Sequence, residues 1–186
     1  MLAEIAISNL GVISHASSEL SPGLTVLTGE TGAGKTMVVT GLRLLTGGRA
    51  DASRVRTGAD GAVVEGAFST QGLPEEVCQA VDAIAVGAGA EPDENGEYVV
   101  SRSVKASGRS SAHLGGRKVP AATLSELAGH LLTIHGQNDQ LRLMAPEQQL
   151  AALDRFDPAI QAKLEAYREA YTAWRKAAKD LQERTE

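Results

Sequence analysis

The residues with the clearest chemical purpose are those of "GETGAGKT", Gly29 to Thr36, which fit the pattern G-x-x-x-x-G-K-[ST]. The glycines let the backbone fold tightly, so that several N–H groups point at one anion. Lys35 can then reach phosphate oxygens, and the Thr36 hydroxyl can ligand Mg²⁺. A helix that begins here adds the positive end of its dipole. A chance glycine turn is the alternative, but an apolar run precedes the motif and an apolar-faced helix follows. The sequence therefore predicts a nucleotide-phosphate site.

Hydrolysis requires a further part, an apolar strand that ends in an acid and orients the attacking water. Two acids are candidates for this role. Glu65 ends "GAVVEG", a segment that is short and close to the loop. Asp154 ends "QLAALD", whose Gln, Ala and Leu favour helix over buried strand. We expect that neither acts, so that the hydrolytic half lies elsewhere. A complete small kinase or NTPase that uses one of them is the alternative.

The elements around the loop predict an α/β fold. Apolar alternation indicates two short strands around Ile5–Ile7 and Val12–Ile13, and then a buried strand, Leu24–Thr28. Helical spacing follows the loop and stops at Gly47–Gly48. The expected later elements are a strand at 62–68, a helix at 74–86, a hairpin of 97–105 with 110–116, and a helix from 122 that runs into a short apolar strand before 135.

The composition changes near Pro146 and becomes rich in Ala, Glu, Lys and Arg, so we expect domains at 1–145 and 146–186. Asp157 and Pro158 form an N-cap and first-turn pair. Beyond them the apolar positions alternate in steps of four and three, which is the a/d seam of a coiled coil. An amphipathic helix lying on the domain is the alternative. The seam positions are Ile160, Leu164, Tyr167, Tyr171, Trp174, Ala178 and Leu181.

Bulk properties narrow the class of protein. Cys78 is the only cysteine, so an internal disulfide or thiolate cluster is excluded, which suits a reducing cytosol. We expect no signal peptide and no membrane span, because no apolar run approaches the required length. The net charge of −5 argues against a surface wrapped in nucleic acid.

Basic residues nevertheless gather in two segments of the chain. One set is Arg43, Arg49, Arg54 and Arg56; the other is Arg102, Lys105, Arg109, Arg117 and Lys118. Such clusters neutralise backbone phosphates in a salt-dependent, sequence-independent way. The hypothesis is that both line one DNA-facing surface, and the alternative is that they form solvated rims.

Several ordered motifs together resemble the RecN family of bacterial DNA-repair proteins, SMC-like members of the ABC-type ATPases. They are "ISNLGVI", "GLTVLTGETGAGKT", "LLTGGRADASRVRTGA", "VEGAF", "GRSSAHLGG", "IHGQNDQ" and "LAALDRF", and they cover essentially the whole chain. The resemblance implies the N-terminal lobe of an ABC/SMC-type head, with a mixed sheet that has a small antiparallel part, followed by the start of an α-helical coiled coil.

The resemblance also implies roles for individual residues. Lys35 and the Q-loop residue Gln137 would be catalytic, and Thr36 and Gln137 would ligand Mg²⁺. Arg56 would lie near the nucleotide or DNA face. The ATP-binding residues would be Gly29, Glu30, Thr31, Gly32, Ala33, Gly34, Lys35, Thr36 and Met37.

The implied partners are the C-terminal half of the same head, a second head in a homodimer, and DNA, with no membrane. The implied location is the cytoplasm, in association with the nucleoid. ATP would clamp two heads together, and the signature motif of the facing head would complete the site. A third alternative is an interaction module with a structural phosphate loop, whose terminal helix docks a partner.

Overall fold

A computed structural model describes residues 1–29, 34–134, 149–150, 153–154 and 158–185. The chain divides into two compact units, Met1–Ile134 and His135–Glu186. The domain boundary between residues 145 and 146 stays a prediction.

A six-stranded sheet forms the framework of the first unit, in the order β2-β1-β3-β4-β5-β6. Every neighbouring pair is antiparallel. The predicted early strands, the strand at 62–68 and the hairpin are confirmed. The edge strand β6 was not predicted, because two of its three residues are basic. The strands are β1 Leu2–Leu10, β2 Ile13–Glu19, β3 Gly61–Ser69, β4 Glu97–Lys105, β5 Ser110–Leu114 and β6 Arg117–Val119.

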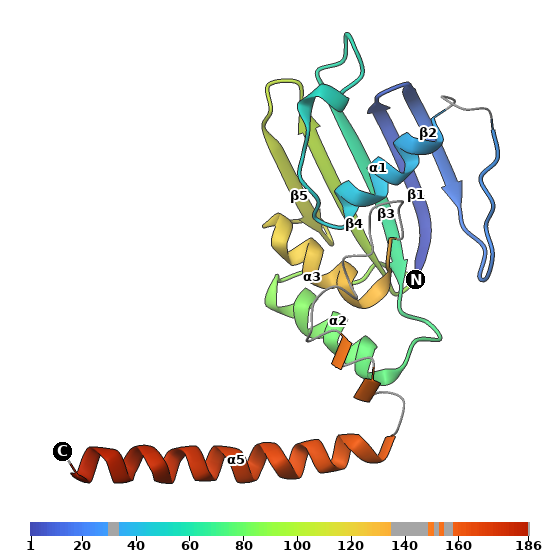
Figure 1. The fold of residues 1–186 in the computed structure, drawn as a ribbon. Helices are drawn as coiled ribbons and strands as arrows, with labels where there is room; N and C mark the ends of the chain where they lie inside the picture. Colours follow the sequence, from blue (N-terminus) through green and yellow to red (C-terminus); the bar gives the residue numbers. More distant parts are fainter. Residues whose placement is uncertain (30–33, 135–148, 151–152, 155–157, 186) are drawn as a thin grey trace. The chain divides into compact units, whose positions relative to one another are not determined.

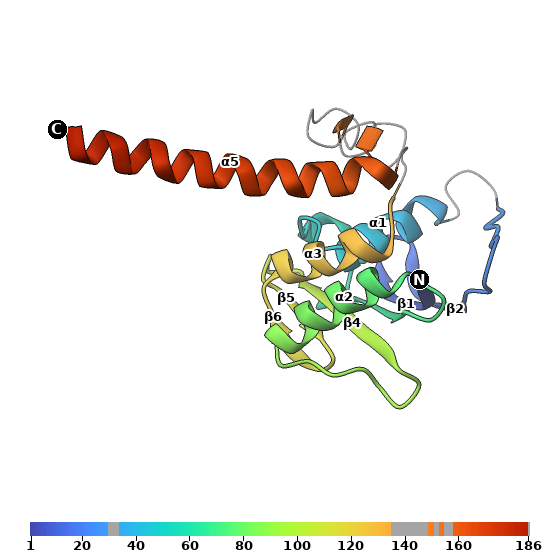
Figure 2. The ribbon, with the colours of Figure 1, turned by 90° about the horizontal axis from the view of Figure 1, so that it is seen from below.

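The α-helices of the first unit lie on one face of this sheet (Figures 1 and 2). α1 (Lys35–Leu45) packs on β1, β3 and β4, and α3 (Ala121–Leu131) packs on β5. α2 (Glu75–Gly87) packs against α3. A short 3-10 helix, η1 (Ala52–Arg54), lies between α1 and β3 in the sequence. The predicted helices are thus confirmed.

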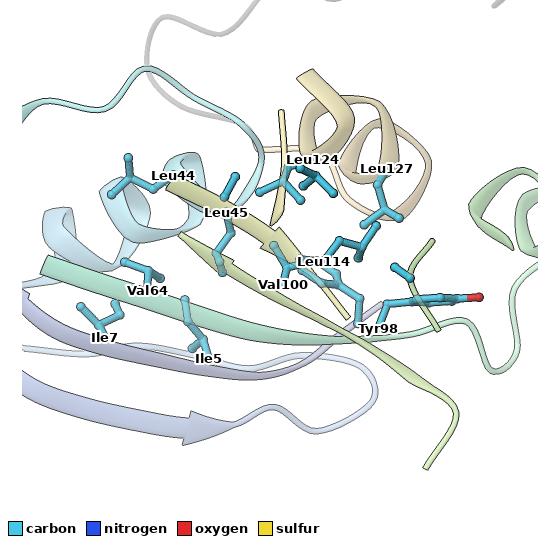
Figure 3. Packing of buried hydrophobic residues seen from close by; sticks show 14 of the residues in the cluster. Ile5, Ile7, Leu44, Leu45, Val64, Tyr98, Val100, Leu114, Leu124 and Leu127 are labelled. Carbon is cyan, nitrogen blue, oxygen red and sulfur yellow. The ribbon is translucent and has the colours of Figure 1, made fainter. Parts of the chain in front are cut away.

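The core lies between the sheet and α1 and α3 (Figure 3). Leu44 and Leu45 come from α1, and Leu124 and Leu127 from α3; all four are buried. Their burial stabilises the fold by roughly 1.5–3 kcal/mol for each large apolar side chain. They meet inward-facing residues of the strands, which are Ile5, Ile7, Val64, Val100 and Leu114.

α1 approaches the sheet most closely at Gly41, which is buried. A Cβ placed there would lie 3.0 Å from Ile7 Cδ1 and 3.4 Å from Val64 Cγ1. A larger side chain would therefore push the helix away from the strands.

α1 ends at the pair Gly47–Gly48. Gly47 has φ +78°, and the Gly48 N–H donates to the Arg43 carbonyl at 2.8 Å. This turn ends α1, as the Gly-Gly pair predicted.

The predicted buried strand Leu24–Thr28 is wrong. These residues have no regular secondary structure, and Leu24 and Val26 are 87% and 65% exposed. A buried strand needs a neighbour on each side, and the described part of the sheet ends at β2. The short strand expected after α3 is likewise not formed over Leu132–Ile134. The parallel part of the predicted mixed sheet is therefore not seen among the described residues.

The second unit contains the long helix α5, Pro158–Thr185, of 28 residues. The predicted helix from Pro158 is confirmed; Asp157, the predicted cap, lies outside the described residues. Along one face, the rings of Tyr167 and Tyr171 are 5.9 Å apart and those of Tyr171 and Trp174 are 5.6 Å apart. All three rings are exposed within the described chain. The coiled coil itself stays a prediction.

Among the described helices, none has the length and apolar character needed to cross a membrane.

Tyr98 connects the sheet to α2. Its side chain is 5% exposed, and its hydroxyl donates to Asp82 Oδ1 at 2.7 Å. Burial, with the hydrogen bond to Asp82 as a second cause, raises the pKa of Tyr98 from 10.0 to about 12. Because the folded-state pKa is the higher one, this contribution to stability is complete below pH 10. It is lost as the pH rises through 12.

We expect Tyr98→Phe to lower the free energy of unfolding at pH 7 by about 1 kcal/mol, the usual net value of one hydrogen bond. Between pH 10 and 12 the wild-type chain should lose more stability than the variant, so that its advantage at pH 7 disappears before pH 12. Urea unfolding followed by circular dichroism over this pH range measures both effects. A constant difference between the two proteins up to pH 12 would contradict the assignment.

Candidate functional site

The described ends of the glycine loop are Gly29 and Gly34, and α1 begins directly after the second. Gly34 has φ +98°, a left-handed conformation, and it is the N-cap of the helix. Its carbonyl accepts the N–H groups of Met37 and Val38 at 2.8 and 3.1 Å. No side chain caps this helix end, and its first turn contains no acid. Among the described residues, the N-cap and first turn of α1 thus bring no anionic side chain to the positive end of its dipole.

Lys35 and Thr36 form the first turn of α1, and both are exposed. The Lys35 Nζ donates to the Gly29 carbonyl, so its side chain folds back across the two ends of the loop. The Thr36 carbonyl accepts the Thr40 hydroxyl at 2.9 Å. Both residues are thus at the helix end where the motif predicts phosphate and metal binding. The remaining predicted loop residues, Glu30–Ala33, and the Q-loop residue Gln137 lie outside the described residues, and their roles stay predictions.

A hollow of about 390 Å³ lies beside the start of α1. This volume falls in the range of small-molecule sites, roughly 300–1,000 Å³. Gly11, with φ +54°, belongs to the wall: a Cβ there would lie 2.4 Å from Met37 Sδ, so a larger residue would displace the Met37 side chain and would also strain the β1–β2 turn. The full lining is Gly11, Val12, Gly34, Thr36, Met37, Ser53 and Arg54. Three segments far apart in sequence therefore meet next to the phosphate loop.

Arg56 lies behind this wall and is half-buried. Its Nη1 donates to the Val12 carbonyl at 2.7 Å, and its backbone N–H donates to the Asn9 carbonyl at 2.9 Å. The residue thus holds the β1–β2 turn against the segment after η1. The sequence contained no signal for this contact, since the partners are 44 positions apart. The predicted contact of Arg56 with nucleotide or DNA stays a prediction.

The residues at this helix end fit a magnesium nucleotide. Mg²⁺ takes few protein ligands and is held mainly by phosphate oxygens and water. One hydroxyl, that of Thr36, supplies such a ligand at the end of the loop. In the described part of the chain, no group of three or more His, Cys, Asp or Glu side chains could hold a metal ion by itself.

Glu65 and Asp154, the two acids considered for hydrolysis, do not end a buried strand in the described residues. Glu65 is exposed on β3, on the face opposite its neighbour Val64, which is buried beneath α1. It lies in a shallow hollow with Glu4, Asp93 and Glu97. Asp154 is helical, as its sequence favours. The structure therefore gives no support to a complete small NTPase built on either acid.

Arg102 is buried, so its predicted place in the second cluster of surface basic residues is wrong. It is 5% exposed and lies on β4 between Val64 and Ala112, on the inward face with Val100 and Val104. Burial lowers the pKa of its guanidinium. Among the described residues, its Nε has no hydrogen-bond partner. Strand alternation, which points residues 98, 100, 102 and 104 to the same face, was the signal that could have revealed this.

Comparison with known proteins identifies the family. A family model described as an AAA domain matches residues 4–186. The chain belongs to this family. RecN from Mycobacterium leprae, described as a DNA repair protein, is 56% identical over 184 residues, covering 99% of this chain and 31% of the relative. The predicted resemblance to RecN is confirmed, and the chain spans about a third of the length of the curated relatives it matches.

Solved structures confirm the fold class. The Smc head domain with an extended coiled coil from Pyrococcus furiosus, bound to the C-terminal domain of ScpA, matches with a TM-score of 0.63. It is 18% identical, and the match covers 96% of this chain and 48% of that one. A structure from work on ATP-driven dimerization and DNA-stimulated activation of SMC ATPases matches with a TM-score of 0.57 at 19% identity. Here the match covers 84% of this chain and 99% of that one. The AAA-domain chain therefore has the fold of an SMC-type head lobe.

Arg102→Met tests the cost of the buried guanidinium. The change keeps an unbranched apolar side chain and removes the unpaired Nε, so we expect the free energy of unfolding to rise by about 1 kcal/mol. Denaturant unfolding measures it, with Arg102→Lys, which keeps the charge, as the matched control. A large loss of stability in the Met variant alone would show that the guanidinium is bonded in the folded protein.

Proposed function

We propose that this AAA-domain chain is the ATP-binding half of a RecN-like, SMC-type ATPase head that acts in repair of DNA double-strand breaks by recombination. Its domains would be the lobe at 1–145 and the root of a coiled-coil arm at 146–186. Hydrolysis would require the C-terminal half of the same head, within the two thirds of the curated relatives that this chain does not cover. The protein would work in the cytoplasm, in association with the nucleoid.

The observation that carries the proposal is the start of α1, where Gly34, Lys35 and Thr36 form a helix end without a side-chain cap or an acid. Lys35 would neutralise the β and γ phosphates of ATP, and Thr36 and Gln137 would ligand Mg²⁺. The ion supplies charge compensation at the phosphates when bound. The hollow beside Thr36 has room for the rest of the nucleotide.

The exposed stretch Leu24–Thr28 supports the need for a second half. Its apolar side chains face solvent, although the sequence has the pattern of a buried strand. A strand supplied by the C-terminal half would pair with it and bury Leu24, Val26 and Leu27. The glycine loop follows directly, so this pairing would also fix the position of Gly29 before the phosphates.

Head dimerisation and DNA binding follow from the same proposal. One similar structure comes from work on ATP-driven dimerization of SMC ATPases, and the curated relatives are described as DNA repair proteins. ATP would clamp two heads together, with Lys35 and Gln137 of one head facing the signature motif of the other. Arg56, next to the wall of the hollow, would lie near that nucleotide or DNA face.

An interaction module is the second candidate. It is favoured by the exposed, successively stacked rings of Tyr167, Tyr171 and Trp174 on α5. In that case the chain would not require nucleotide for its function. ATP binding therefore separates the two candidates.

Binding of ATP is the first test. We expect Lys35→Ala to weaken binding of a fluorescent ATP analogue by tenfold or more, since a charge-assisted hydrogen bond contributes roughly 1.5–3 kcal/mol. Lys105→Ala, which removes the same charge at the exposed end of β4, should leave the affinity unchanged. Equal losses in both variants, or no binding by the wild-type chain, would refute the proposal.

Turnover is the second test. We expect the 186-residue chain to hydrolyse ATP negligibly alone, because neither candidate acid, Glu65 or Asp154, is positioned for the attacking water in the described residues. Addition of the C-terminal half from a RecN relative should produce steady hydrolysis that depends on Lys35. A coupled phosphate-release assay measures both. Multiple turnover by the chain alone would overturn the division of the head.

A further inference from the structure

Strands β4, β5 and β6 have an outer face, opposite to the face on which α1, α2 and α3 lie. Residues of a strand alternate between the two faces, and on β4 every second residue from Tyr98 to Val104 is buried under the helices. The residues between them point outward, where no α-helix of the first unit covers them (Figures 1 and 2). Toward the β4–β5 turn and across to β6, the outward residues are Ser101, Ser103, Lys105, Ser111, His113 and Lys118.

The register of the strands brings these outward residues side by side. His113 pairs with Ser101 on one side and with Lys118 on the other. Ser111 pairs with Ser103, and their hydroxyl oxygens are 2.8 Å apart. Polar side chains from three strands therefore form one continuous surface.

The hairpin turn adds a second basic group to this surface. The Lys105 N–H donates to the Arg109 carbonyl at 2.8 Å, so the two residues lie together where β4 turns into β5. The row of His113 and Lys118 is four residues away, or roughly 13 Å along the strands. Basic side chains thus stand at both ends, with hydroxyl groups between them. We call this surface the outer strip; it consists of Lys105, Arg109, Ser103, Ser111, His113 and Lys118.

The three cationic side chains of the outer strip are available to a ligand. Lys105, Arg109 and Lys118 are all exposed. None of them forms an ion pair or a side-chain hydrogen bond with another described residue. Their charges are therefore not committed to the fold of the described chain.

The acids near the outer strip lie at its margins. Glu65 is on the neighbouring strand β3, and the Asp60 carbonyl accepts the Ala106 N–H at 2.9 Å beside the hairpin turn. Glu126 lines a hollow together with Lys118. Within the described residues, none of these three carboxylates forms an ion pair with the strip.

We propose that the outer strip binds phosphates of a DNA backbone. Lys105, Arg109 and Lys118 neutralise phosphate charges, and the hydroxyl pair supplies a donor between them. Contact between Ser103 and Ser111 uses one of their two hydroxyl hydrogens, so the other can donate to a phosphate oxygen. This placement rests on the proposed function, which makes DNA a partner of the head, and it adds the face of the lobe on which the backbone would lie.

The chemistry of the outer strip favours a nucleic-acid backbone over other partners. The strip contains no Phe, Tyr or Trp on which a base could stack, and no large apolar side chain that could anchor a protein. The short serine side chains let a backbone approach the sheet. On the adjoining part of the same face, Glu4, Glu65 and Glu97 surround a separate hollow and repel phosphates. Contacts of this kind position DNA without reading its sequence.

The outer strip is also separate from the candidate nucleotide site. α1, which carries Lys35 and Thr36, packs on the opposite face of the sheet through Gly41, Leu44 and Leu45. Loss of the strip's charges should therefore leave ATP binding intact.

The test uses the full polypeptide that carries this chain and a labelled duplex of arbitrary sequence. Anisotropy titrations over a series of salt concentrations give the affinity and its salt slope. The variants are Lys105→Ala, Lys118→Ala and the two combined, because these lysines stand at opposite ends of the strip. Arg117→Ala is the matched control. Arg117 is exposed and adjacent to Lys118, but it pairs with the buried Leu114 and so belongs to the helix side of the sheet.

We expect each single variant to reduce the salt slope by up to about 0.9, the contribution of one phosphate contact. The combined variant should show the sum and bind DNA more weakly at every salt concentration, while Arg117→Ala keeps the wild-type slope. An unchanged slope in the combined variant, a change in only one single variant, or an equal change in Arg117→Ala would overturn the outer strip as a DNA site.

Two further ligands separate the alternatives. The combined variant should bind ATP as tightly as the wild type; a parallel loss of ATP and DNA binding would assign these lysines to the nucleotide site instead. A labelled polyglutamate peptide represents an acidic protein partner. If the combined variant loses the peptide but keeps DNA, the strip binds protein and the assignment to DNA is wrong. A wild type that binds ATP but no DNA would overturn the strip alone, whereas a wild type that binds no ATP would overturn the proposed function.

Discussion

Close packing of α1 on the antiparallel sheet is the contact on which the candidate nucleotide site depends. Gly41 lets the helix approach Ile7 and Val64 to van der Waals distance, and Leu44 and Leu45 are buried beside them. With its middle held in this way, the helix presents Lys35 and Thr36 at one end and Arg43 at the other. A tilt of α1 would move both ends together.

The two ends of α1 have opposite electrostatic characters. At the N-terminal end, the positive dipole and an uncapped first turn suit a compact polyphosphate. At the C-terminal end, backbone N–H groups close the last turn. Only the N-terminal end therefore suits the proposed nucleotide site.

The segments that the structure leaves exposed have a common cause. Leu24, Val26 and Leu27, and the rings of Tyr167, Tyr171 and Trp174 on α5, are apolar and exposed within the described chain. Exposure of this kind is expected where the matching surface belongs to another segment. The short match to the curated relatives, about a third of their length, agrees with a head whose second half would supply the missing neighbours.

Local sequence was sufficient to predict the elements whose formation depends on local interactions. Periodicity and turn residues predicted most strands, α1 and its end at Gly47–Gly48, and α5, and the motif Gly29–Thr36 marked the start of α1. It was not sufficient where the outcome depends on a distant neighbour. Leu24–Thr28 has the pattern of a strand but no partner strand among the described residues. Arg102 is a different case, because the local alternation along β4 already indicates that it faces inward. Only the tertiary structure brought Arg56 to Val12 and assembled the hollow beside Thr36, since its walls come from segments whose contacts leave no trace in local sequence.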